Sequence, residues 1–221
     1  MYTFPFFLLG FGYVCLLIWG LSLARNQDLL NFTNVLLLVI IGLVYDNFII
    51  AFGRFIGEGN VLENLSYVRF WLHALFTPTL ILFAWSIYFR TGLPSAKKRF
   101  WKVLAYLITI GLILYELFAS VKGLQLEPNW NNGVLTYESS GQSVGPFMVI
   151  IITIILGIVG LLLMIKFRFF WLFIGTLVMI SGGILAIWIK NFPIMNGLEF
   201  LFIVSLLWTK QFLVRSEKLG L

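Results

Sequence analysis

Long apolar segments constrain this chain more than any other feature of its sequence. A helix needs roughly 20 apolar residues to cross about 30 Å of hydrocarbon, and the sequence consists almost entirely of such segments joined by short polar breaks. With 61% hydrophobic and 11% charged residues among 221, a water-soluble fold could not enclose its apolar side chains. The sequence therefore predicts an integral, multi-pass membrane protein.

The predicted fold is all-α, a seven-transmembrane-helix bundle that forms a single integral membrane domain over residues 1–221. The first segment has no basic leader and no cleavage signature, so we expect it to be retained. Its Cys15 is the only cysteine, which excludes an intramolecular disulfide. The seven predicted segments are Phe4–Ala24, Leu29–Phe52, Val68–Phe89, Trp101–Val121, Pro146–Ile165, Phe169–Ile189 and Ile194–Val214.

The basic residues predict the orientation of the bundle. Lys and Arg are retained on the cytoplasmic side during insertion, and eleven of the fifteen fall on the side that holds Lys97, Lys98, Arg99 and the C-terminus. The N-terminus is therefore predicted outside and the C-terminus inside, with the plasma membrane as the expected location. Because the basic residues sit beside helix ends, the net charge of +6 is a topology signal and no nucleic-acid partner is expected.

The acidic residues show the opposite bias. Seven of the nine fall in or beyond the outer half of the predicted bundle: Asp46, Glu58, Glu63, Glu116, Glu127, Glu138 and Glu199. Three of these, Asp46, Glu116 and Glu199, lie within predicted helices or at their outer ends. An ionisable group at membrane depth costs several kcal/mol unless it is paired, neutral or facing a wet cavity. These three acids are the predicted catalytic residues, and we expect them to face one polar pocket.

The third segment adds two further candidates, Arg69 and His73, which are four residues apart and so share one helix face. Both are expected to pair with carboxylates of neighbouring helices, Arg69 as a substrate-binding residue and His73 in catalysis or proton transfer. Because His73 is the only histidine, we expect no multi-histidine metal or haem site and no cofactor. Polar and aromatic neighbours of these groups complete the predicted substrate-binding set: Tyr45, Asn47, Trp71, Tyr115 and Asn196.

A glycine-rich stretch, 52–64, joins the second and third segments. Two interpretations are open: a re-entrant or capped outer loop in which Arg54 pairs with Glu58 or Glu63, or a lid that contacts substrate. Aromatic residues are abundant, with 23 Phe, 8 Trp and 8 Tyr. A pocket lined by some of them would suit an apolar, polyunsaturated or cationic ligand, because ring faces attract positive charge.

The run from Arg69 to Pro78, Arg-Phe-Trp-Leu-His-Ala-Leu-Phe-Thr-Pro, resembles the third helix of microbial rhodopsins over about ten residues, with the arginine on the outer side. The resemblance implies a seven-helix bundle but does not extend to the chromophore site. Rhodopsins hold retinal through a mid-depth lysine of the last helix, whereas the only lysine there, Lys210, is near the cytoplasmic end. Leu72 and His73 occupy the place of the carboxylate counterion. No light-driven pump is expected.

The layout of a short chain with seven helices and outer-half acids resembles that of compact membrane-bound terpene cyclases. Those enzymes use membrane carboxylic acids to protonate an epoxide or olefin of a prenyl chain. By position in the layout, the matching acids would be Asp46 and Glu199.

Three functional hypotheses follow from the sequence. In the first, a carboxylic acid kept protonated by the low dielectric donates a proton to a prenyl or other lipid substrate. The second is a transporter, receptor-like or ligand-binding bundle in which the same acids and Arg69 bind an ion or polar solute. The third is an accessory or assembly protein without a cavity. The expected partners are the bilayer and a lipid or isoprenoid substrate; the sequence assigns no oligomeric state.

Overall fold

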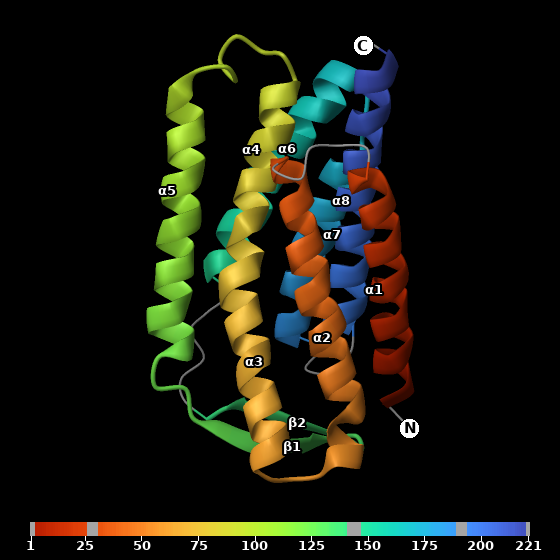
Figure 1. Cartoon of the computed structure of the whole chain (residues 1–221), viewed down its shortest axis with the longest axis vertical. Coiled ribbons are helices and arrows are strands. Elements are labelled where there is room, and N and C mark those ends of the chain that lie inside the picture. Colours follow the sequence, from red (N-terminus) through yellow and green to blue (C-terminus); the bar gives the residue numbers. More distant parts are fainter. Residues whose placement is uncertain (1–2, 26–30, 141–146, 189–193, 220–221) are drawn as a thin grey trace.

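The computed structural model describes residues 3–25, 31–140, 147–188 and 194–219 as a helical bundle with one β-hairpin at its end (Figure 1). Leu29, Pro146 and Ile189, which bound predicted segments, and Lys190 lie outside these residues. The helices are α1 (Thr3–Ala24), α2 (Val35–Ile56), α3 (Asn60–Phe76), α4 (Leu80–Arg90), α5 (Arg99–Glu116), α6 (Phe147–Phe167), α7 (Trp171–Trp188) and α8 (Ile194–Leu219). Short helical turns lie at η1 (Phe32–Asn34), η2 (Thr77–Thr79) and η3 (Leu117–Val121), and the strands are β1 (Leu126–Asn131) and β2 (Val134–Ser139).

Seven apolar helical rods match the seven predicted segments. Within the described residues, six are long and apolar enough to cross a membrane: Thr3–Ala24, Phe32–Ile56, Asn60–Arg90, Arg99–Val121, Phe147–Phe167 and Ile194–Ser216. The seventh, in α7, is a shorter apolar helix, Trp171–Leu185. These helices confirm the predicted helical bundle and indicate a membrane protein.

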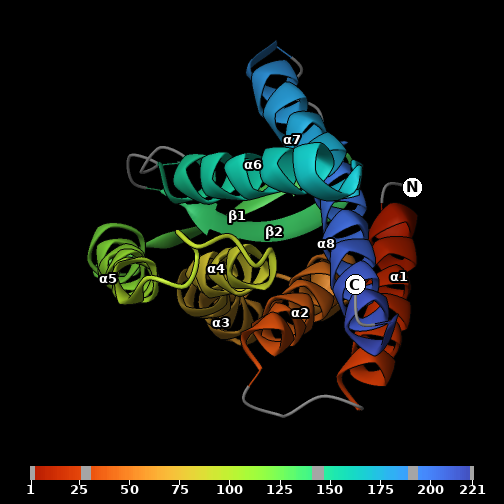
Figure 2. The same cartoon turned by 90° about the horizontal axis from the view of Figure 1, so that it is seen from above.

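The helices form a closed ring in the order α1, α2, α4, α6, α7, α8, and α5 stands outside the ring against α4 (Figure 2). The two described chain ends lie at opposite ends of the bundle (Figure 1). We call the end that holds β1 and β2 the hairpin end. The opposite end, where α4 is joined to α5 through Lys97 and Lys98, is called the basic end.

The packed core runs through the ring of helices. Leu36, Ile40, Phe83 and Leu207 are each 0% exposed and belong to one continuous apolar cluster. Close helix approach contributes at α7, because a Cβ on Gly175 would overlap the Ser205 hydroxyl of α8. Small residues at such crossings let membrane helices pack closely. Val39 and Leu43 of the same cluster also line the cavity described below.

A short break separates α3 from α4 within one continuous rod of residues 60–90. Pro78 has no amide hydrogen to donate to the carbonyl four residues earlier, and its ring disfavours a regular α-helix at this point. The chain instead forms the 3₁₀ turn Thr77–Thr79, in which the Thr79 hydroxyl donates to the Phe76 carbonyl at 2.6 Å. The break places Thr77 one turn beyond His73, where the two side chains meet.

The hairpin β1–β2 is not predicted by the sequence analysis, which expects only a connection between the segments Trp101–Val121 and Pro146–Ile165. Its two strands pair antiparallel, with Asn131 opposite Val134. Asn132 and Gly133 between them have φ of 51° and 82°, and two consecutive positive φ values are typical of a type I′ turn, for which Asn-Gly is a preferred sequence. The Asn132-Gly133 dipeptide is therefore the feature of the sequence that could have predicted this hairpin.

The glycine-rich stretch is mostly helical, which corrects both earlier interpretations of it. Helix α2 continues to Ile56, α3 begins at Asn60, and only a tight turn at Gly57 and Gly59 (φ of 82° and 144°) separates them. Arg54 forms no salt bridge with Glu58 or Glu63. Instead the Trp130 indole of β1 donates to the Glu58 carboxylate at 2.5 Å. The stretch supports the hairpin and lines neither cavity at the bundle centre.

Gly53 of α2 holds the hairpin against the bundle. A Cβ at this position would overlap the backbone carbonyl oxygen of Leu135 in β2. We expect Gly53→Ala to lower the free energy of unfolding by about 1–3 kcal/mol, the usual cost of overpacking. The control is Gly111→Ala in α5, where a Cβ meets open space and better helix propensity should be neutral or stabilising. Denaturation of both variants in detergent would measure the difference; equal stabilities would contradict this packing.

Candidate functional site

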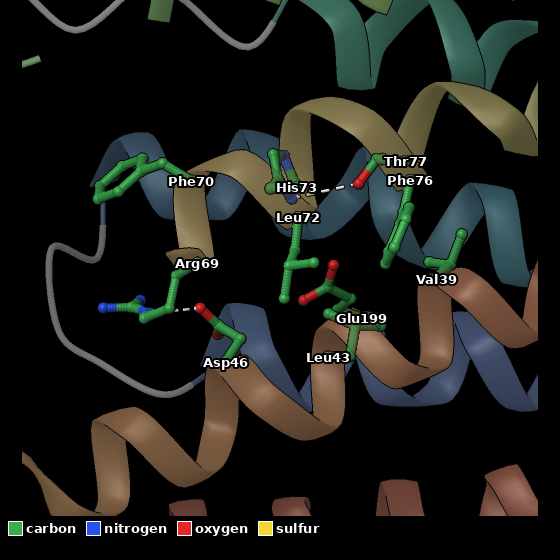
Figure 3. A pocket seen from close by; sticks show the side chains of 11 residues that line it. Val39, Leu43, Asp46, Arg69, Phe70, Leu72, His73, Phe76, Thr77 and Glu199 are labelled. Atoms are coloured by element: carbon green, nitrogen blue, oxygen red, sulfur yellow. Dashed lines mark hydrogen bonds and ion pairs between the residues drawn. The ribbon is translucent and has the colours of Figure 1, made fainter. Parts of the chain in front are cut away.

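A cavity of about 250 Å³ lies between α2, α3 and α8 (Figure 3). Its polar groups are Asp46 from α2, Arg69 and His73 from α3, Thr77 from η2 and Glu199 from α8. Aliphatic and aromatic side chains form the rest of the wall. The cavity therefore collects two of the three predicted acids and both predicted basic groups.

The first polar pair in the cavity is an ion pair between neighbouring helices. Arg69 Nε donates to Asp46 Oδ1 at 2.6 Å, with side chains 15% and 26% exposed. This confirms the expectation that Arg69 pairs with a carboxylate of another helix. A charge-assisted hydrogen bond of this length fixes both groups, and Arg69 offsets a negative charge on Asp46. The pair supplies fixed charge at one end of the cavity.

The second polar pair lies one helical turn further along the same face. His73 Nδ1 and Thr77 Oγ1 are 3.2 Å apart, and which of them donates depends on the imidazole tautomer. Figure 3 shows the pair above Leu72, on the α3 side of the cavity. His73 does not pair with a carboxylate as expected. The contact with Thr77 leaves Nε2 as the second ring nitrogen through which the imidazole can accept or donate a proton.

Glu199 differs from the other two acids in its contacts. It makes no hydrogen bond or ion pair with any residue that the structure describes, and its carboxyl group projects from α8 toward Leu72 (Figure 3). A carboxylate removed from water without a partner costs several kcal/mol, and the neutral acid avoids that cost. A carboxyl group that no described residue pairs with is suited to hold a proton or to meet a ligand in this cavity.

A smaller cavity of about 40 Å³ continues from the first toward the centre of the ring. The two share Val39, His73, Thr77 and Glu199. Residues of α4, α6, α7 and α8 close the smaller cavity, and Thr153 is its remaining hydroxyl. Glu199 and His73 thus stand on the boundary between a wider chamber and a narrow pocket.

The walls of the larger cavity are mainly apolar. Gly42 leaves room that a side chain would fill, with Phe76 3.5 Å from where its Cβ would stand. Phe70 lines the cavity and also packs into the apolar cluster that Leu126, Leu135 and Tyr137 of the hairpin form with α3. In Figure 2 the hairpin crosses the end of the bundle beside α3 and α6. Through Phe70, the hairpin supports the cavity wall.

Glu116 is not brought into the cavity, although the sequence predicted it there. It is 8% exposed at the end of α5, and its Oε2 accepts a hydrogen bond from Ser120 Oγ at 2.6 Å. Ser120 lies in the π-helical turn η3, one turn beyond the carboxyl group. Helix α5 stands outside the ring, so its inward face meets α3 and α4 and does not reach the central space.

The predicted substrate-binding residues, apart from Arg69, do not line the cavity. Tyr45 donates to the Leu65 carbonyl at 2.9 Å, and Asn47, which is fully buried, donates to the Leu43 carbonyl at 2.9 Å. Tyr115 packs on Phe147 with ring centroids 5.3 Å apart. The remaining two, Trp71, which is 46% exposed, and Asn196, are outside the cavity wall.

Sequence reasoning missed Thr77 and Gly42. The signal for Thr77 was its spacing of four residues from His73, the same spacing that identified Arg69. Gly42 precedes Asp46 by four residues and so lies on the face of α2 that carries the acid. Within the described residues, no three His, Cys, Asp or Glu side chains are grouped so that they could hold a metal ion.

Comparison with known proteins adds no relative to this description. No protein-family model, no curated protein sequence and no solved structure matches the chain.

Proposed function

We propose that this protein is a membrane-embedded enzyme that acts on a prenyl or other lipid substrate by protonating it, as the terpene cyclases that it resembles in layout do. The observation that carries the proposal is the Glu199 carboxyl, which has no hydrogen-bond or ion-pair partner among the described residues and lies in a largely apolar cavity of about 250 Å³. Acid catalysis needs a carboxyl group that is protonated at the working pH, and a carboxyl group that no described cation pairs with, among mainly apolar walls, favours that form.

In the proposed reaction, the Glu199 O–H bond breaks and its proton passes to an olefinic carbon or an epoxide oxygen of the substrate. With an olefin, the π bond breaks as one carbon takes the proton; with an epoxide, one ring C–O bond breaks and the oxygen stays on the substrate as a hydroxyl group. In both cases the substrate becomes a carbocation, and Glu199 is left as a carboxylate. Ring closure then forms a carbon–carbon or carbon–oxygen bond within the substrate. The cyclised cation finally loses a proton, which returns to the protein. Atoms balance as an isomerisation, so no co-reactant is needed.

The other polar groups have separate roles in this proposal. The Asp46–Arg69 pair, held at 2.6 Å, provides a fixed field that positions a polar end of the substrate. His73 accepts the released proton and returns it to Glu199 in this proposal, which is supported by both residues bordering the same two cavities. Phe70 and Phe76 present rings to the cavity, and ring faces stabilise positive charge.

Incubation of the purified protein with prenylated and epoxy-prenylated substrates tests the proposal. We expect products of unchanged mass and altered chromatographic retention. In deuterated water, an olefin protonated at carbon should gain one deuterium, which raises the product mass by about one unit and separates protonation from uncatalysed rearrangement. If no substrate in either class is converted, the acid chemistry is wrong.

The second candidate function is the binding of an ion or polar solute, in a transporter or a receptor-like protein. The charged Asp46–Arg69 pair beside Glu199 favours it, because such groups often mark solute paths in membranes. Against transport, the basic half of the ring is filled by the apolar core around Ile40 and Phe83, which would have to open. Solute flux into protein-containing vesicles, lost in Asp46→Asn, would favour this candidate over the enzyme.

We also propose that the basic end faces the cytoplasm and the hairpin end the exterior, with the plasma membrane as the host bilayer. The distribution of Lys and Arg along the sequence supports this orientation, as do chain ends at opposite ends of the bundle (Figure 1). The cavity would then open into the outer half of the membrane.

A further inference from the structure

A second cavity, of about 300 Å³, lies in the basic half of the bundle, away from the site described above. Helix α4 forms its floor, with Ala84, and α5 and α6 form its two sides, with Ala105 and Val159 among the lining residues. Both side helices pack on α4, and α5 and α6 meet at the hairpin end, where Tyr115 packs on Phe147, beyond the residues that line this cavity. Figure 2 shows both helices beside α4. The result is a groove along the outer surface of the bundle, which we call the α5–α6 groove.

The composition of the α5–α6 groove walls suits a hydrocarbon ligand. They are almost entirely aliphatic and aromatic, and Ile158 on the rim is 57% exposed. The lining of α4 runs from Ile81 to Tyr88, which corresponds to about 10 Å of helix axis at roughly 1.5 Å per residue. One leaflet of hydrocarbon is about 15 Å deep. An extended acyl chain from one leaflet can therefore lie along this part of α4.

The mouth of the groove is at the basic end. There Tyr88 and Trp101 meet edge to face with ring centroids 5.7 Å apart, and Lys102 Nζ stands 5.9 Å from the centroid of Trp85. Exposed Lys97 and Lys98 lie in the turn just beyond. Aromatic rings beside lysines are the usual composition of a protein surface at the level of lipid head groups.

The segment of the chain that carries the lysines at this mouth has no acidic residue to neutralise them. The sequence contains no acidic residue between Glu63 and Glu116. The nearest neighbour from α6, Lys166, is a further cation and donates to the Thr91 carbonyl. Basic pockets between helices on the cytoplasmic side are suited to anionic head groups, so the charge of the mouth complements a lipid phosphate and the groove complements its chain.

We propose that the α5–α6 groove binds one anionic phospholipid, with an acyl chain along α4 and the phosphate at Lys97, Lys98 and Lys102. This site is independent of the reaction proposed at Glu199.

Native mass spectrometry of the full chain in detergent tests the proposal with three probes: phosphatidylglycerol, phosphatidylcholine of the same acyl chains, and glycerol 3-phosphate. We expect one tightly held phosphatidylglycerol, at least tenfold weaker phosphatidylcholine, and no retained glycerol 3-phosphate. Equal retention of the two lipids would overturn the proposal. Equal binding of glycerol 3-phosphate would also overturn it, because the groove would then contribute nothing.

Two sets of variants assign the binding to this groove. Leu162→Trp and, independently, Ile158→Trp place a large ring on its α6 wall and should each weaken phosphatidylglycerol binding tenfold or more. Ile154→Trp on the same helix, 52% exposed and outside the groove, should leave it unchanged. A groove variant that retains its fold and still binds as wild type would overturn the proposal.

The charge variants address the head group. Lys97→Gln and Lys98→Gln should each weaken phosphatidylglycerol binding by about fivefold and leave phosphatidylcholine unaffected. Lys122→Gln, a charge removal near the hairpin end, is the matched control and should change neither lipid. If Lys122→Gln weakens phosphatidylglycerol binding as much as Lys97→Gln and Lys98→Gln do, the effect comes from the net charge of the protein. The assignment of the phosphate to the turn between α4 and α5 is then wrong.

Discussion

Glu199→Gln is expected to reduce the proposed protonation-initiated turnover by roughly 10²–10⁴-fold, the usual contribution of a positioned general acid. The amide has nearly the shape of the carboxylic acid but carries no acidic proton. Since Glu199 makes no hydrogen bond or ion pair with a described residue, its replacement removes no known contact that holds the fold together. The variant should therefore elute and unfold like the wild type, and product formation with an olefinic substrate measures the loss.

Glu116→Gln is the matched control for this experiment. Glu116 is also a carboxyl group within a predicted membrane-spanning helix, but it bonds to Ser120 and does not line the cavity. We expect the turnover of the Glu116→Gln variant to stay within a few fold of the wild-type value. Equal losses in both variants would point to a general effect of acid removal. Full activity in Glu199→Gln would remove Glu199 as the proton donor and with it the proposed mechanism.

Arg69→Met is expected to have the largest effect on stability, lowering the free energy of unfolding by about 3–5 kcal/mol. The reason is that Asp46 would remain in a cavity of mainly apolar walls without the partner it now holds at 2.6 Å. The pair is partly buried, and removal of one member of an ion pair shielded from water leaves an uncompensated charge. Replacing both members in Asp46→Asn/Arg69→Met should recover most of the loss, because neither charge then needs compensation.

Denaturant titrations of the single and double variants in detergent measure these energies as a double-mutant cycle. The control is Arg54→Met, which removes an exposed arginine that forms no salt bridge with a described residue and should change stability by about 0.5 kcal/mol or less. If Arg69→Met is no more damaging than this control, water reaches the pair freely and the cavity is wetter than its walls suggest.

Part of the site could be predicted from the sequence because helix geometry is local. Arg69, His73 and Thr77 recur every four residues, so one face of one helix had to carry all three, whatever surrounds it. The pairing of Arg69 with a carboxylate was predicted from the cost of an isolated charge in a membrane, and the structure identifies that carboxylate as Asp46.

The choice among the acids could not be predicted in the same way. Glu116 and Glu199 are both carboxyl groups near the outer ends of apolar helices, and nothing in their local sequence distinguishes them. Their difference comes from α5 standing outside the ring while α8 is part of it. The rotation and place of a helix in a bundle are set by contacts with other helices, such as the close approach of Gly175 to Ser205.

The apolar helices, the short breaks between them and the gathering of acids toward one end could be predicted from the amino-acid sequence, because length, hydropathy and charge act through the bilayer on each segment separately. Three features required the fold: which polar side chains share a cavity, the support of its wall by the hairpin through Phe70, and the groove that α5 and α6 leave over α4. These features depend on the distances between segments far apart in the chain, which packing alone sets.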